Sequence, residues 1–165
     1  MNNKNKITNV LFYGIGGQGV LSASEVCALA ALYDGHHVKK SEVKGMSQRG
    51  GSVESYVRFG PCVVSPLPQR STVDILVCLY ESEYSRLSSE LRKGGVDLFP
   101  YLKKALSAIG EQKIFLNALM LGVVASFLPI REESWLKAID ATFSRQQEKN
   151  KEFFFQGRRF KGGKA

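Results

Sequence analysis

The first third of the chain holds the pattern that most restricts the fold, which is a short apolar strand, a glycine turn and an apolar helix. Residues 7–13 are rich in β-branched and aromatic side chains and predict a buried strand. Residues 14–19 match G-x-G-x-x-G, and residues 20–32 place apolar and small side chains at helical spacing. A glycine turn in this context is typical of Rossmann-like α/β folds, and the free N–H groups at the start of its helix favour an anion such as phosphate.

The glycine turn alone does not identify a ligand. A classical NAD site would need an acid at the end of the second strand, roughly 20 residues on. Asp34 has that spacing but precedes the strand, and Glu42 comes late. The turn therefore predicts a phosphate or cofactor contact rather than classical NAD binding, with tight packing alone as the alternative. The candidate binding residues are Gly14, Gly16, Gly17, Gln18 and Gly19.

A second glycine-rich segment, residues 44–52, lies between two segments with the pattern of strands, 37–43 and 52–59. Its glycines let the backbone approach another surface, and its Ser, Gln and Arg side chains donate to oxygen-rich ligands. We expect a binding loop, with Glu42 and Arg49 as candidates for a catalytic role. A structural pair between these two residues is the alternative. The candidate binding residues are Gly45, Met46, Ser47, Gln48, Arg49, Gly50 and Gly51.

The remaining segments predict an α/β domain with a Rossmann-like, mostly parallel sheet flanked by helices. Residues 52–65 predict a β-hairpin turned at Gly60-Pro61, and the apolar run 72–80 predicts a central parallel strand. Glu81 and Glu83 follow that run and suit either an acid–base pair or the first turn of a helix. Helices are expected over 82–91, 96–109, 117–127 and from 131 to 143, followed by the C-terminal segment.

The net charge of +8 is concentrated at the C-terminus, where the last 21 residues carry seven basic and two acidic side chains. We divide the chain into a domain at 1–144 and a basic tail at 145–165. The tail holds three consecutive phenylalanines, 153–155, which could fold back onto the domain or dock on a partner. A basic tail is more often solvated or partner-docking than a nucleic-acid contact, so no nucleic acid is expected.

Cysteine and histidine usage argues against a metal or cluster site in this chain. Cys27, Cys62 and Cys78 are scattered without a C-x-x-C pair, which indicates reduced, buried thiols and excludes a four-cysteine iron–sulfur site. The two histidines, His36 and His37, are too few for a self-contained zinc site. No apolar run approaches 18 residues and no leader pattern is present, so a cytoplasmic protein without a membrane segment is expected.

Several segments together resemble the gamma-type subunit or domain of the 2-oxoacid:ferredoxin oxidoreductase family, and its indolepyruvate-type small subunit in particular. The resemblance extends over residues 7–157. Its most specific part is Glu42-Val43-Lys44-Gly45-Met46-Ser47-Gln48-Arg49-Gly50-Gly51-Ser52. Further matches are Gly14-Ile15-Gly16-Gly17-Gln18-Gly19-Val20-Leu21, Arg58-Phe59-Gly60, Ser65-Pro66-Leu67, Val73-Asp74, Glu81-Ser82-Glu83, Asn117-Ala118-Leu119-Met120-Leu121-Gly122, Leu128-Pro129-Ile130 and Lys149-Asn150.

The resemblance implies a chain that holds no cofactor alone, with thiamine diphosphate, Mg and 4Fe-4S clusters in a larger partner subunit. The implied reaction is oxidative decarboxylation of an aryl 2-oxoacid such as indolepyruvate, with acylation of coenzyme A and reduction of ferredoxin. A hetero-oligomer is implied, with a homodimer as the alternative for the isolated chain. A stand-alone nucleotide-binding Rossmann module is the alternative function. Residues 96–116 are shorter than the family pattern, which leaves open whether a sheet strand is absent.

Overall fold

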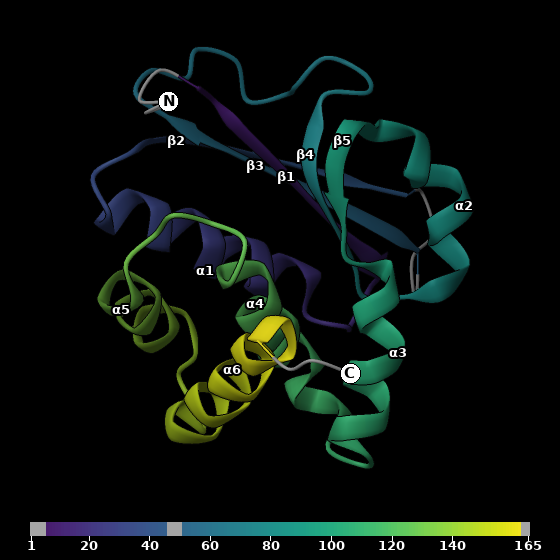
Figure 1. The fold of residues 1–165 in the computed structure, drawn as a ribbon, viewed down its shortest axis with the longest axis vertical. Coiled ribbons are helices and arrows are strands. Elements are labelled where there is room, and N and C mark those ends of the chain that lie inside the picture. The colour runs from purple at the N-terminus through teal and green to yellow at the C-terminus, as the bar shows by residue number, and fades with distance from the viewer. Residues whose placement is uncertain (1–5, 46–50, 163–165) are drawn as a thin grey trace.

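The computed structural model describes residues 6–45 and 51–162, which form a five-stranded sheet with helices gathered mainly on one side (Figure 1). The strand order is β2-β3-β1-β4-β5. The strands are β1 (Thr8–Ile15), β2 (His37–Lys44), β3 (Ser52–Gly60), β4 (Val73–Cys78) and β5 (Leu91–Asp97). The helices are α1 (Val20–Tyr33), α2 (Tyr84–Leu87), α3 (Phe99–Ile109), α4 (Leu116–Ala125), α5 (Glu132–Thr142) and α6 (Gln147–Gly162), with short 3₁₀ turns η1 (Glu81–Glu83), η2 (Ser88–Glu90) and η3 (Lys113–Phe115). The predicted α/β class and the strand, glycine turn and helix at the start of the chain are confirmed.

The sequence predicted a mostly parallel sheet, but the sheet is mixed, with two parallel and two antiparallel strand pairs. β1 pairs in parallel with β4, and β4 in parallel with β5. β3 lies between β1 and β2 and is antiparallel to both. The reason is that β2 and β3 are joined directly through the second glycine segment, so they form a hairpin instead of a crossover unit.

The predicted hairpin over residues 52–65 is wrong, because residues 61–65 form no strand. β3 already has β1 on one edge and β2 on the other, so it offers no free edge to a returning strand. The segment crosses the sheet face opposite the main helices (Figure 1). Arg58 holds it there by donating from Nη1 to the carbonyl oxygens of Ser65 at 2.6 Å and Leu67 at 2.9 Å.

The predicted helix over residues 82–91 is present as three successive short helical elements rather than as one continuous α-helix, and its last residue, Leu91, begins a strand. Residues 81–90 form η1, α2 and η2, and the chain then runs into β5 along the open edge of β4. The sequence pattern of residues 92–95, two basic residues and two glycines, is typical of a helix end. The segment nevertheless lies inside β5, where Gly94 has a φ of +74°. The sequence did not predict this edge strand, which includes the first two residues of the short segment 96–116.

Asp74 of β4 connects three neighbouring strands, β1, β4 and β5, near their amino ends. Its carboxylate accepts from the Lys6 amine at 2.7 Å, the Asn9 backbone N–H at 2.9 Å and the Arg92 guanidinium at 2.6 Å. Burial alone would raise the pKa of this carboxyl, but the hydrogen bonds outweigh burial and the pKa is lowered. Asp74 thus contributes to stability as an anion.

The C-terminal helix α6 packs against α4, and the two phenylalanines Phe153 and Phe154 are buried in the domain core. Of the two alternatives for these side chains, folding back is the one observed. The crossing is close because both helices present glycine: a Cβ on Gly122 would lie 1.9 Å from the Phe154 carbonyl oxygen, and one on Gly157 would lie 1.9 Å from that of Leu119. Within residues 6–45 and 51–162, no helix is long and apolar enough to cross a membrane.

We expect Gly122→Ala and Gly157→Ala each to lower the free energy of unfolding by about 2 kcal/mol or more, because the methyl group must push two backbones apart. Urea denaturation followed by circular dichroism measures this. Ala108→Ser on the exposed face of α3 is the control and is expected to stay within about 0.5 kcal/mol of wild type. Wild-type stability for both glycine variants would contradict the close crossing.

We expect Asp74→Asn to lower the free energy of unfolding at pH 7 by about 2 kcal/mol, because three donors lose a charged acceptor. The pKa of Asp74 is lowered in the folded state, so its contribution is fully present above the unfolded value of about 3.9 and is lost as pH falls through the folded value. The variant should therefore lose less stability than wild type on acidification below about pH 5. Asp140→Asn, which removes a surface pair with Lys151, is the control.

Candidate functional site

The two glycine segments meet at the carboxyl end of β1. The Gly16 backbone N–H donates to the Gly51 carbonyl oxygen at 3.0 Å, and Ile15 lies opposite Ser52 in the sheet register. The Gly45 N–H donates to the Ser52 carbonyl oxygen at 2.8 Å and closes the neck of the loop. The rest of the predicted loop, which is Met46, Ser47, Gln48, Arg49 and Gly50, lies outside the described residues.

This meeting point is where an α/β sheet offers a ligand site. β1 and β4 are neighbouring parallel strands, and the chain leads from β1 to β2 at one edge of the sheet and from β4 to β5 at the other. Ligands of open α/β sheets bind at the carboxyl ends of the strands at such a switch point. The glycine turn after β1 and the segment after β4 both border a pocket there. Its volume is about 570 Å³, and it is lined by Gly17, Gln18, Leu79, Tyr80, Glu81, Leu102, Leu106, Lys113, Ile114 and Leu116.

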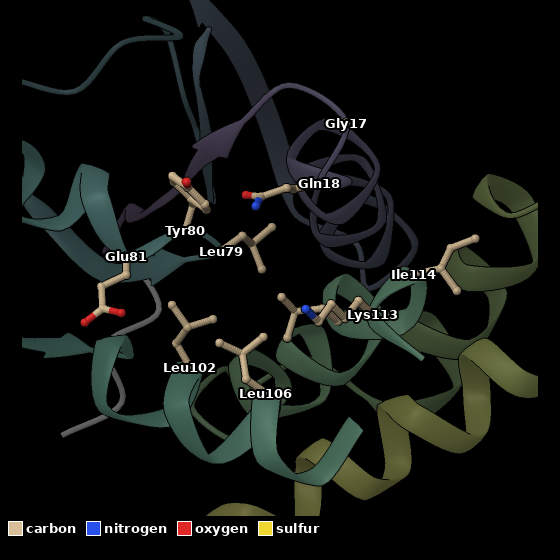
Figure 2. Close-up of a pocket in the computed structure, with 10 residues that line it drawn as sticks. Gly17, Gln18, Leu79, Tyr80, Glu81, Leu102, Leu106, Lys113 and Ile114 are labelled. Carbon is tan, nitrogen blue, oxygen red and sulfur yellow. The ribbon is translucent and has the colours of Figure 1, made fainter. Parts of the chain in front are cut away.

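Figure 2 shows how this first pocket is built. Leu102 and Leu106 of α3 face Leu79 across the pocket. Gln18 extends toward it from the glycine turn, and Lys113 enters from η3. The pocket is therefore mostly apolar, with an amide and an amine at its border, as is typical of small-molecule sites.

The glycine turn leaves the start of α1 open. Gly17 and Gly19 have φ values of +91° and +75°, which favour glycine. Gln18 folds back so that its Oε1 accepts from the Ile15 N–H at 3.3 Å. Among the described residues no side chain caps α1, and its first turn has no acidic residue, so its N–H groups and the positive end of its dipole are available to an anion.

A second pocket of about 370 Å³ adjoins the first at the glycine turn. Gly17, Gln18, Lys113 and Ile114 line both pockets, and the second is completed by Gly19, Phe115, Asn117, Phe143, Arg145, Gln146 and Asn150. Sequence reasoning missed Lys113, Asn117 and Arg145 as site residues. The one signal was Asn117, a polar residue in an otherwise apolar helix, which is 94% buried.

The acidic candidates are held in ion pairs or lie at the rim. Glu42 accepts from Lys40 at 2.9 Å and lies 3.7 Å from Lys44, and the hydrogen bond from Lys40 lowers the pKa of its carboxyl. A carboxyl with a lowered pKa suits ordering the loop better than taking up a proton near pH 7. The Glu81 carboxylate borders the first pocket but points away from its centre (Figure 2).

Asp34 is not placed as the ribose-binding acid of a classical NAD site. Its Oδ1 accepts from the Arg131 guanidinium at 2.8 Å and the Ser134 hydroxyl at 2.9 Å. Burial acts to raise the pKa of this carboxyl, but those hydrogen bonds prevail and lower it. Asp34 thus anchors the start of α5 to the end of α1.

The cysteines only partly follow the sequence expectation. Cys27 and Cys78 are buried, and burial raises the pKa of both thiols. Cys62 is exposed, contrary to the prediction of three buried thiols, because it lies in the connection that failed to form a strand. Among the residues that the structure describes, no group of three or more His, Cys, Asp or Glu side chains could hold a metal ion.

We expect Gly19→Ala to destabilise the protein more than Gly17→Ala. Both require an unfavourable positive φ, which costs about 1–2 kcal/mol. At Gly19 the new Cβ would also meet the Asn117 amide nitrogen at 2.4 Å, whereas at Gly17 it would meet none of the described residues within 4 Å. Thermal unfolding of the two variants tests this. The difference should shrink in an Asn117→Ala background, and an equal cost for both variants would contradict the contact.

Comparison with known proteins places these features in a family. The family model for pyruvate ferredoxin/flavodoxin oxidoreductase matches residues 9–101. The indolepyruvate oxidoreductase subunit IorB of Thermococcus kodakarensis is 41% identical over 88 residues, which are 53% of this chain and 44% of that relative. The ketoisovalerate oxidoreductase subunit VorA of Methanothermobacter marburgensis is 33% identical over 79% of this chain and 31% of its own length. The matches thus span less than half of these relatives.

Solved structures show the same fold at low sequence identity. The 2-oxoglutarate:ferredoxin oxidoreductase of Magnetococcus marinus, solved with 2-oxoglutarate, coenzyme A and succinyl-CoA bound, superposes with a TM-score of 0.82 at 17% identity. That superposition covers 98% of this chain and 32% of the other. Since the family model matches more than half of the sequence, the chain belongs to the pyruvate ferredoxin/flavodoxin oxidoreductase family.

Proposed function

We propose that this chain is the gamma-type subunit of a 2-oxoacid:ferredoxin oxidoreductase and supplies half of a site that a larger subunit completes. The observation that carries the proposal is the junction of the two glycine segments through Gly16 and Gly51, beside an open pocket at the carboxyl end of β1 and β4. The resemblance to IorB favours indolepyruvate or another aryl 2-oxoacid as substrate.

The proposed ligand of this half-site is coenzyme A, the acyl acceptor. Coenzyme A combines phosphate groups with a long, less polar arm. The uncapped start of α1 suits the phosphates, and the pocket bordered by Leu79, Leu102 and Leu106 suits an apolar portion. The Magnetococcus enzyme, which shares the fold, was solved with coenzyme A bound. The role of this chain would be to bind and orient the acceptor, which lowers the entropic part of the barrier to acyl transfer.

The redox cofactors are proposed to lie in the partner. The three cysteines do not fit a 4Fe-4S cluster, since two are in the core with raised thiol pKa values and four thiolates are needed. Thiamine diphosphate with Mg would supply the decarboxylation chemistry there. In the net reaction the 2-oxoacid would lose carbon dioxide, its acyl group would pass to the coenzyme A sulfur with release of the thiol proton, and two electrons would reduce ferredoxin. We place the complex in the cytoplasm.

We expect Arg49→Ala to reduce 2-oxoacid-dependent viologen reduction by the complex with the large subunit. Arg49 is proposed to pair with a phosphate or carboxylate, and the loss of one charge-assisted hydrogen bond costs about 1.5–3 kcal/mol, or roughly tenfold or more in kcat/KM. Arg70→Ala, an exposed arginine in the β3–β4 connection, is the matched control. Unchanged kcat/KM for Arg49→Ala would remove the proposed role of Arg49.

Calorimetry of the isolated chain with coenzyme A, NAD(P) and FAD separates this proposal from a stand-alone dinucleotide-binding module. We expect no tight nicotinamide binding, since Asp34 is held by Arg131 and Ser134 and is not free for a ribose. Tight NAD(P) binding without a partner subunit would overturn the proposal.

A further inference from the structure

An exposed apolar patch lies on the sheet face opposite the main helices. Val43, Val64 and Leu67 are 45%, 85% and 50% exposed, and they are three of the eight large apolar side chains exposed among the described residues. Val43 shares its face of β2 with Ser41, whose hydroxyl donates to the Pro66 carbonyl oxygen at 3.3 Å. The β3–β4 connection, which carries Val64 and Leu67, is thus held beside β2. Exposed apolar side chains that gather on one surface mark interaction sites, whereas singly scattered ones do not.

The segment that carries Val64 and Leu67 is held in one conformation although it forms no strand. The Arg58 guanidinium donates from Nη1 to the carbonyl oxygens of Ser65 and Leu67 at 2.6 and 2.9 Å. Its Nε donates to the Asn9 side-chain oxygen at 2.8 Å, which fixes the guanidinium itself on β1. A surface that is already ordered loses little conformational entropy when a partner binds, so this clamp suits the patch for docking.

Two positive charges without a carboxylate partner lie beside the patch. Lys39 is exposed and lies opposite Arg58 in the register of β2 and β3, on the same face of the sheet as Ser41. Arg58 donates to neutral oxygens, and neither cation has an ion-pair partner within residues 6–45 and 51–162. An apolar centre with a charged border is typical of protein interfaces, and this border favours a partner surface that carries acidic side chains. The centre is aliphatic and offers no ring for base stacking, so the chemistry is that of a protein partner rather than a nucleic acid.

The position of the patch indicates which protein covers it. Val43 lies two residues before Gly45, whose N–H donates to the Ser52 carbonyl oxygen and closes the neck of the second glycine segment. Gly51, at the other side of that neck, accepts from the Gly16 N–H at 3.0 Å, where the half-site begins. The patch is therefore continuous with the part of the molecule that a larger subunit is proposed to complete.

We propose that the patch formed by Val43, Val64 and Leu67 docks an apolar surface of the larger subunit that is bordered by acidic side chains. The partner's identity rests on the proposed function. Docking here would seat the larger subunit on the sheet face beside the neck of the second glycine segment. A second copy of this chain is the competing occupant, and the test separates the two.

The test is surface plasmon resonance of the full-length chain on the immobilised large subunit. Leu67→Glu is expected to weaken binding about tenfold or more, because a carboxylate would face an apolar surface bordered by acids. The matched control is Leu32→Glu at the end of α1, where the leucine is 53% exposed and lies outside the patch, and it should bind as wild type. Thermal unfolding checks that both variants fold. Wild-type affinity for Leu67→Glu, or equal weakening in the control, would overturn the proposal.

The charged border has its own readout in the association rate. Lys39→Glu is expected to lower that rate about threefold or more and to reduce its dependence on salt, because steering by the cation is lost. Lys103→Glu, an exposed lysine of α3, is the control and should leave the rate unchanged. An unchanged rate for Lys39→Glu would count against an acidic border on the partner.

The same measurements separate this proposal from the proposed function. If the wild-type chain does not bind the large subunit, both are overturned. If it binds and Leu67→Glu binds equally well, the proposed function stands and the patch fails. If Leu67→Glu instead converts a dimer of the isolated chain into a monomer in analytical ultracentrifugation, with binding to the large subunit intact, the patch joins two copies of this chain and the proposal is overturned.

Discussion

The close crossing of α4 and α6 at Gly122 and Gly157 is the contact on which the rest of the site depends. Two backbones can approach this closely only where no side chain intervenes, and the crossing brings the start of α6 beside the start of α4. Asn117 lies at the start of α4 and Asn150 near the start of α6, so both walls of the second pocket follow from this geometry. The crossing also seals Phe153 and Phe154 into the core.

Local patterns in the sequence were sufficient for the first part of the fold. The apolar strand, the glycine turn and the helix after it are specified by neighbouring residues, and the apolar run at Val73–Cys78 by its own composition. The errors arose where the outcome depended on which strand edges were free. Residues 61–65 have the pattern of a strand, but β3, their predicted partner, has no free edge. Residues 92–95 have the pattern of a helix end, but they lie in β5, which pairs with the free edge of β4. Edge availability is a property of the assembled sheet.

The residues of the candidate site also differ in how far the sequence predicts them. The glycine turn could be predicted because its role depends on its backbone conformation, and the spacing of its glycines is typical of that conformation. Lys113 and Arg145 could not, since nothing near them in the sequence indicates that an apolar helix and a basic C-terminal segment will meet at the turn. Asn117 is intermediate. Its position in an apolar run marked it as unusual, but only the fold shows that its amide lies against Gly19.

The arrangement of the outer strands bears on how this fold can associate with other chains. β2 forms one edge of the sheet, and its exposed lysines Lys39 and Lys44 disfavour the approach of another strand. β5 forms the other edge, where a register shift against β4 and the positive φ of Gly94 interrupt a regular ladder. Both ends of the sheet thus resist growth by strand addition. We expect a neighbouring subunit to meet this domain through side chains and loops, so that assembly need not compete with the pairing that holds the sheet together.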